Sequence, residues 1–103
     1  MVAPYNPPVR GEDFVMRIAL IDPSGTFKAS PTLAAGDFKI SKDGGALANL
    51  TTLPTNNPSG SIWITISLSA AEMTADNVAI QAIDQTSTKE WLDWAMCILT
   101  TVA

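Results

Sequence analysis

Residues 61–68 read Ser-Ile-Trp-Ile-Thr-Ile-Ser-Leu, and this stretch decides the fold class. Apolar side chains recur at every second position, and the positions between them carry Trp, Thr and Ser. A period of two is typical of a β-strand that buries one face. β-branched isoleucines also pack well on a pleated sheet. The stretch therefore predicts a core strand with Ile62, Ile64, Ile66 and Leu68 pointing inward.

Similar alternation on either side of this stretch predicts further strands. They span residues 14–21, 37–42, 46–53, 78–84 and 91–101. The inward side chains expected from the strongest patterns are Met16, Ile18, Leu20, Phe38, Ile40, Leu92, Trp94, Met96 and Ile98. In residues 46–53 the leucines do not share one parity, so a bulge or bend is expected there.

Turn-forming residues separate these segments. Asp22-Pro23-Ser24-Gly25 predicts a β-turn, and Lys42-Asp43-Gly44-Gly45 predicts a tight hairpin, because Asp-Gly tolerates positive φ. Residues 55–60 and 85–88 are expected to be loops. Ser69 and Glu72 have the spacing of a capping box, and Leu68 and Met73 could form a hydrophobic staple around it. We therefore expect one short helical turn after the 61–68 strand.

The pattern as a whole predicts an all-β fold. Short strands at regular spacing, joined by hairpin-length loops, favour an immunoglobulin-like or fibronectin-like antiparallel β-sandwich with one short helical turn. Residues 14–103 would form this sandwich. Residues 1–13 carry Pro4, Pro7 and Pro8 and are expected to be an extended N-terminal arm. The arm would lie against a neighbouring chain or along the domain's own edge strand; the alternative is a loose tail ordered only by packing.

Charge and hydropathy exclude two classes of partner. The 103 residues contain six Lys plus Arg and ten Asp plus Glu, which gives a net charge of −4. The basic residues are scattered along the chain, whereas nucleic-acid binders concentrate them on a stripe or face. No apolar run approaches the ~20 residues that a membrane-spanning helix needs. We therefore expect no direct nucleic-acid binding and no membrane insertion.

The residues that carry chemistry are scarce. The chain has no histidine, the commonest general base and metal ligand, and its single cysteine, Cys97, lies in an apolar run and is expected to be a buried hydrophobe. Four aspartates at strand ends, Asp22, Asp43, Asp76 and Asp84, would either bind calcium between loops or form turns. They lack calcium-loop spacing, so turn formation is favoured. We expect a non-enzymatic protein with no catalytic, cofactor-binding or metal-binding residues and no cofactor.

Aromatic residues point instead to a protein interface. Trp63 and Trp91 fall on the outward parity of their predicted strands, and Trp is enriched at contact hot spots. Tyr5 and Val9 would be the apolar anchors of the arm. The alternative for the tryptophans is burial under loops or under the arm. The interface candidates are therefore Tyr5, Val9, Trp63 and Trp91, and a homo- or hetero-oligomer is expected.

Residues 38–78 also resemble a known group of proteins. The shared features are Lys42-Asp43-Gly44-Gly45, Asn49-Leu50, Thr52-Leu53-Pro54 and residues 67–73, Ser-Leu-Ser-Ala-Ala-Glu-Met. This combination resembles small immunoglobulin-like structural modules of tailed bacteriophage virions, and the likeness extends over roughly residues 14–84.

The resemblance implies a virion structural protein assembled in the host cytoplasm. Such a protein would bind other virion proteins as a decoration or cement protein, or as a neck or fibre adaptor. The alternative is a carbohydrate- or receptor-binding β-sandwich, in which Trp63 and Trp91 would stack on sugar rings.

Overall fold

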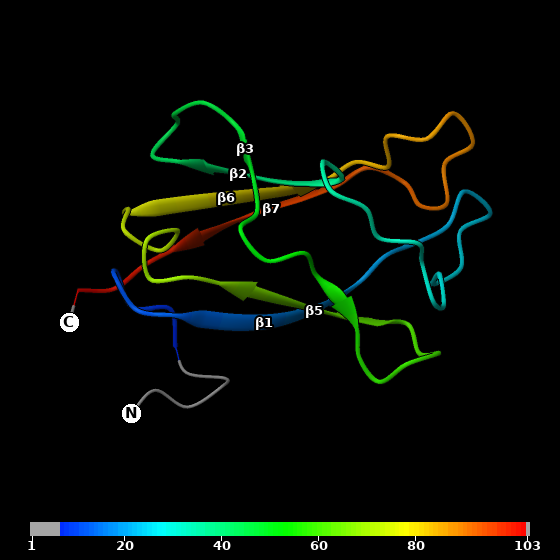
Figure 1. Cartoon of the computed structure of the whole chain (residues 1–103), viewed down its shortest axis with the longest axis horizontal. Coiled ribbons are helices and arrows are strands. Elements are labelled where there is room, and N and C mark those ends of the chain that lie inside the picture. Colours follow the sequence, from blue (N-terminus) through cyan, green and yellow to red (C-terminus); the bar gives the residue numbers. More distant parts are fainter. Residues whose placement is uncertain (1–6, 103) are drawn as a thin grey trace.

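The computed structural model describes residues 7–102, and these residues form two β-sheets without any helix (Figure 1). The strands are β1 (Phe14–Ala19), β2 (Phe38–Lys42), β3 (Ala48–Asn49), β4 (Thr55–Asn56), β5 (Trp63–Leu68), β6 (Asn77–Ala82) and β7 (Trp94–Leu99). The three-stranded sheet has the order β1-β5-β4, and the four-stranded sheet has the order β3-β2-β6-β7.

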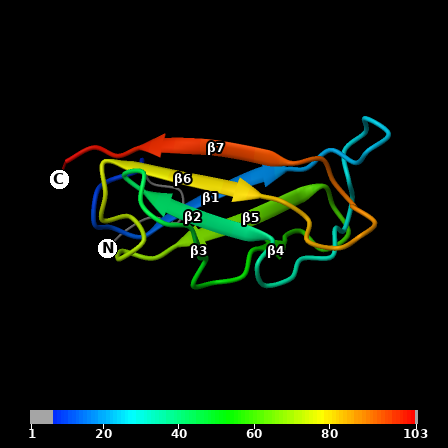
Figure 2. The same ribbon diagram turned by 90° about the horizontal axis from the view of Figure 1, so that it is seen from above.

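All strand pairs within the two sheets are antiparallel. In Figure 2, seen from above, the strands of the two sheets overlap and cross at a modest angle. Sequence neighbours β1 and β2 lie in different sheets, and so do β3 and β4, and β5 and β6. This order corresponds to strands B-E-D facing C′-C-F-G, so the predicted immunoglobulin-like sandwich is confirmed.

The core lies between the sheets, and its residues follow the predicted alternation. Ile64, Ile66 and Leu68 of β5 are buried, and their register partners on β1 are Ile18, Met16 and Phe14. Opposite them, β2 and β6 contribute Phe38, Ile40, Val78, Ile80 and Ala82. The period of two therefore predicted the inward faces of β1 and β5.

The Asp43-Gly44 hairpin is also confirmed. Asp43 and Gly44 have φ angles of 51° and 78°, and the Gly45 N–H donates to the Lys42 carbonyl over 2.9 Å. Positive φ at both central residues characterises the hairpin turn whose twist matches that of the flanking strands. Its Asp43 carboxylate accepts hydrogen bonds from the Asp76 and Asn77 N–H groups, so it also ties the hairpin to the start of β6.

The predicted strand over residues 46–53 is wrong in its length and its course. Only Ala48 and Asn49 pair with β2, and the chain then crosses to the other sheet, where Thr55 and Asn56 pair with β5. Residues 55–60 therefore include a short strand and are not entirely loop. Leu47, Leu50 and Leu53 do not share one parity because the chain leaves one sheet and joins the other within this segment.

The predicted helical turn is not present. The segment after β5 makes one hydrogen-bonded turn, in which the Met73 N–H donates to the Ser69 carbonyl. The capping-box bonds nevertheless form: the Ser69 N–H donates to Glu72 Oε1 over 2.9 Å, and the Glu72 N–H donates to Ser69 Oγ over 3.2 Å. Helix propagation ends at once because Asp43 holds the Asp76 and Asn77 N–H groups at the start of β6.

The last strand is shorter than predicted, which changes the surroundings of several side chains. β7 spans Trp94–Leu99, so Leu92 precedes it, donates its N–H to the Ile21 carbonyl and is 51% exposed instead of inward. Met96 pairs with buried Ile80 but is partly exposed, because β7 is the edge of its sheet. Cys97 is exposed, so its predicted burial is wrong.

Candidate interaction surface

Of the two arm candidates, only Val9 belongs to the residues that the structure describes. Tyr5 is outside the described residues. Val9 forms a parallel bridge with Thr101: the Arg10 N–H donates to the Thr101 carbonyl over 2.8 Å, and the Thr101 N–H donates to the Pro8 carbonyl over 3.0 Å. The Gly11 N–H also donates to the Met73 carbonyl. Residues 8–11 therefore contact the domain's own chain just after β7 and the turn after β5.

Trp91 is not an interface residue. It is fully buried, its ring centroid lies 6.3 Å from that of Phe38, and its Nε1–H donates to the Ala82 carbonyl over 3.2 Å. The predicted outward orientation of Trp91 is wrong, because Trp91 precedes β7 and side chains outside a regular strand need not alternate. Its indole closes the end of the core between the sheets.

Trp63 is exposed as predicted, but one side of its ring is occupied. The side chain is 42% exposed, and the Arg17 guanidinium lies 5.1 Å from the ring centroid. Arg17 also donates to the Asn57 carbonyl over 3.1 Å. A sugar ring that stacked on this side of the indole would have to displace Arg17, and buried Trp91 cannot supply a second stacking surface.

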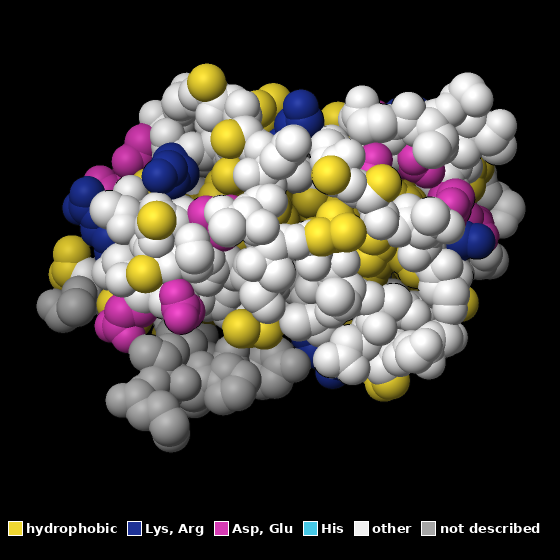
Figure 3. All heavy atoms as spheres, in the orientation of Figure 1, with side chains coloured by type: hydrophobic (Ala, Val, Ile, Leu, Met, Phe, Trp, Pro, Cys, Tyr) yellow, Lys and Arg dark blue, Asp and Glu magenta, His cyan; other side chains and the backbone are white. Residues whose placement is uncertain are grey.

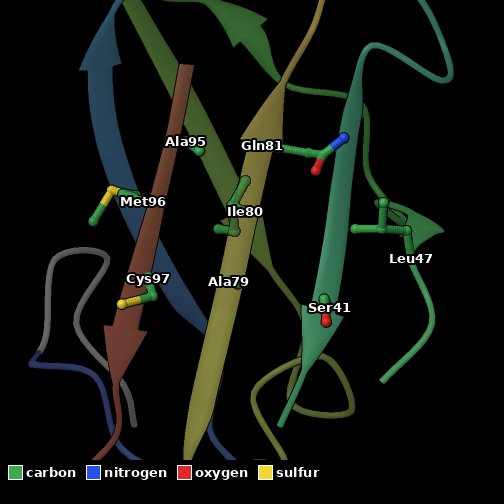
Figure 4. Close-up of a pocket in the computed structure, with 8 residues that line it drawn as sticks. All are labelled: Ser41, Leu47, Ala79, Ile80, Gln81, Ala95, Met96 and Cys97. Atoms are coloured by element: carbon green, nitrogen blue, oxygen red, sulfur yellow. The ribbon is translucent and has the colours of Figure 1, made fainter. Parts of the chain in front are cut away.

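The outer face of the four-stranded sheet carries an uncharged, mostly apolar hollow. The hollow has a volume of about 290 Å³. Figure 4 shows the lining residues on neighbouring strands: Ser41 on β2, Ala79, Ile80 and Gln81 on β6, and Ala95, Met96 and Cys97 on β7, with Leu47 beside β3. None of these lining residues is charged. The side chains of Ile80 and Met96 have the inward parity, so they line the hollow only from below. We call the other lining residues, together with Leu99 on the outer face of β7, the apolar face.

Two leucines at the margins of the apolar face are strongly exposed. Leu47 is 51% and Leu99 is 70% exposed. Sequence reasoning missed this face because it considered only the inward parity of the last strand. The sequence did contain a sign of this face: residues 95, 97 and 99 are Ala, Cys and Leu, so the outward positions of β7 are apolar as well as the inward ones. An edge strand with a solvated outer face normally carries polar side chains there.

Two further hollows are smaller. One of about 140 Å³ lies beside β3 and β4 and is lined by Phe38, Leu50 and Pro54 among others. Another, of about 260 Å³, lies on the outer side of β1 and β5 near Asp13, Val15 and Ser67. In the view of Figure 3 the Lys and Arg side chains are scattered among Asp and Glu, and no basic patch forms on that face.

The aspartates act as turn formers. Asp22 accepts hydrogen bonds from the side chains of Ser24 and Thr26 and from their backbone N–H groups, which lowers the pKa of its carboxyl to about 2. Burial alone would raise the pKa of Asp84. The Glu90 and Thr86 N–H groups and the Thr86 hydroxyl outweigh burial, so this pKa is lowered. Within residues 7–102, no group of three or more metal-ligating side chains is close enough to hold a metal ion.

Comparisons with known protein families, curated proteins and solved structures found no match for this chain. No helix among residues 7–102 is long and apolar enough to cross a membrane.

Proposed function

We propose that this protein is a non-enzymatic structural module that binds other proteins in the virion of a tailed bacteriophage. The observation that carries the binding role is the apolar face, where uncharged side chains from β2, β6 and β7 line one hollow and Leu47 and Leu99 stand exposed beside it. Contiguous exposed apolar surface on a small domain marks interaction sites.

The chemistry of the apolar face suits a protein partner. Its side chains are small or aliphatic, apart from Ser41 and Gln81. The Ser41 hydroxyl already donates to the Gly45 carbonyl, and the Gln81 amide can donate to a partner or accept from it. The net charge of −4 and the scattered basic residues disfavour nucleic acid. Such a face fits a packed protein–protein contact with a hydrophobic core.

The virion setting is supported by the sequence resemblance of residues 38–78. Parts of the shared motif have structural roles here: Asp43-Gly44 forms the hairpin, and Ser69 and Glu72 form the reciprocal cap. In this setting the protein would be a decoration or cement protein, or a neck or fibre adaptor. Carbohydrate binding has less support, because Trp91 is buried and Arg17 covers part of Trp63.

A particle-association experiment tests this proposal. The chain is tagged in the genome that encodes it, and lysates are separated on a density gradient. We expect the tagged protein to band with DNA-filled particles. Recovery only from the soluble fraction would contradict the virion role.

A matched pair of substitutions tests the apolar face in the same experiment. Leu47→Glu places a charge on this face, and we expect about tenfold less protein on particles. Leu92→Glu is the control, because Leu92 is equally exposed, at 51%, and does not line the hollow. Equal association of the two variants would contradict a role for the apolar face.

A further inference from the structure

The hollow on the apolar face is formed by small side chains that lie between larger ones. Ser41, Ala79 and Cys97 are register neighbours on β2, β6 and β7, and Figure 4 shows them in one row across the sheet. Leu47 lies beside this row next to β3, and Gln81 lies two residues further along β6. The row is therefore lower than its surroundings, and a hollow of about 290 Å³ is open above it.

The size of the hollow suits one large side chain. A volume of about 290 Å³ is at the lower end of pockets that bind small molecules, so it takes a single ring system rather than a whole segment. Aromatic side chains bury about 150–250 Å² each and dominate the energetics of interfaces. Trp and Tyr are enriched among the anchors that fill interface pockets. An aromatic side chain of a partner therefore fits this hollow.

A lysine lies at the margin of the hollow, on the same face of the sheet. Lys39 of β2 is the register partner of Gln81, which lines the hollow, and the side chains of directly paired residues lie on the same face. Neither of the two ion pairs within residues 7–102 involves Lys39. The ammonium group of Lys39 therefore offers an unpaired positive charge to a partner with a carboxylate.

The spacing between the hollow and Lys39 matches that of an extended chain. Lys39 lies two residues from Ser41 along β2, which corresponds to about 7 Å at the rise of a β-strand. In an extended segment, residues i and i+2 project to the same side over the same distance. An extended segment with an aromatic residue and, two positions away, Asp or Glu can therefore fill the hollow and meet Lys39 at the same time.

We propose that the apolar face binds an extended segment of another virion protein, which inserts an aromatic side chain into the hollow and presents a carboxylate to Lys39. Gln81 lines the hollow and pairs with Lys39, so its amide can hydrogen-bond the same segment. A basic residue in place of the carboxylate would be repelled by Lys39, so the charge selects among apolar segments. The inference rests on the proposed function and deepens it, because it assigns the chemistry of the partner.

Two short peptides test this chemistry on the purified full chain. Acetyl-Trp-Gly-Glu-amide carries both groups at the proposed spacing, and acetyl-Trp-Gly-Lys-amide reverses only the charge. Binding is followed by NMR from the backbone amide signals of Ala79 and Cys97. We expect the acidic peptide to bind with a dissociation constant of about 1–10 mM, about fivefold more tightly than the basic peptide. Unchanged signals at about 20 mM acidic peptide, or equal binding of the two peptides, would overturn the proposal.

Lys39→Glu tests the contact with the carboxylate. This variant should reverse the preference, so that the basic peptide binds about fivefold more tightly than the acidic one. Lys28→Glu is the matched control, because Lys28 is also partly buried but does not line the hollow or pair with a residue that does. An unchanged preference in Lys39→Glu, or the same reversal in Lys28→Glu, would contradict a contact between Lys39 and the carboxylate.

Ala79→Leu tests the insertion of the aromatic side chain. The larger side chain fills the space above the central row, and we expect the acidic peptide to bind about tenfold more weakly. Ser67→Leu adds a leucine to the outer face of β5, the central strand of the other sheet, and serves as the control. Urea denaturation checks that both variants fold. Wild-type affinity of a folded Ala79→Leu variant would show that nothing enters the hollow.

The peptide and particle experiments distinguish this inference from the proposed function. Particle association without peptide binding would contradict the aromatic and acidic partner and leave the virion role intact. Peptide binding without particle association would contradict the virion role and support the chemistry assigned to the hollow.

Discussion

Trp91 and Trp63 show how strongly the surroundings of a single residue decide its contribution to stability. Trp91 is the largest fully buried side chain of the described residues, and its indole N–H is hydrogen-bonded within the core. Trp63 lies on the outer side of the three-stranded sheet against Arg17. Removal of the first leaves a cavity in the core, whereas removal of the second leaves a solvated surface.

We therefore expect Trp91→Ala to lower the free energy of unfolding by about 3–5 kcal/mol. Trp63→Ala should cost less than about 1 kcal/mol, because an exposed cation–π contact contributes little. Urea denaturation followed by circular dichroism measures both values. Similar losses for the two variants would mean that Trp91 does not close the core.

Glu72 connects two segments at the scale of secondary-structure elements. Its Oε1 accepts a hydrogen bond from the Ser69 N–H, and its Oε2 accepts one from the Thr51 N–H over 3.0 Å. The side chain is buried, so both bonds form away from bulk water. Glu72 thus joins the turn after β5 to the segment that crosses between the sheets.

Glu72→Gln should lower the free energy of unfolding by about 1–3 kcal/mol, because an amide group then meets a buried N–H donor. Ser69→Ala removes only the bond to the Glu72 N–H and should cost about 0.5–2 kcal/mol. Chemical denaturation gives both numbers. Asp13→Asn changes a nearby exposed carboxylate and should have little effect; a loss as large as that of Glu72→Gln would argue against the proposed connection.

Carboxylates hold loops together throughout the whole molecule. Asp37 accepts from the Ala34 and Gln85 N–H groups, and Asp84 accepts from those of Thr86 and Glu90. Such contacts compensate for the small core of a domain of this size. They also make stability depend on pH, because a protonated carboxyl accepts these bonds less well.

Stability should therefore fall in acid. The pKa values of Asp22 and Asp84 are lowered by folding, so their contribution is complete above the unfolded value of about 3.9 and is lost as pH falls through the folded values. For Asp22 the folded pKa is about 2. We expect the urea midpoint to decrease between about pH 4 and about pH 2. The Asp84→Asn variant should be less stable than the wild type at neutral pH, and its urea midpoint should change less with pH. A urea midpoint that changes with pH as steeply as in the wild type would contradict the role of Asp84.

The sequence alone was sufficient for features governed by local rules. Alternation predicted the inward faces of Ile18, Ile64 and Ile66, because the side-chain period of a strand is independent of its partners. Asp43-Gly44 predicted its hairpin for a similar reason, since positive φ is a property of these residues. The reciprocal bonds of Ser69 and Glu72 are local as well, although no helix follows them.

Only the tertiary structure decided which groups meet from distant parts of the chain. The strand order put β2, β6 and β7 side by side, so their outward side chains together became the apolar face. Trp91 is buried because Phe38 and Ala82 of the four-stranded sheet surround its indole, which no local period encodes. The crossing between β3 and β4 likewise depends on where two sheets end, and a pattern read along one segment contains no information about the distance to the other sheet.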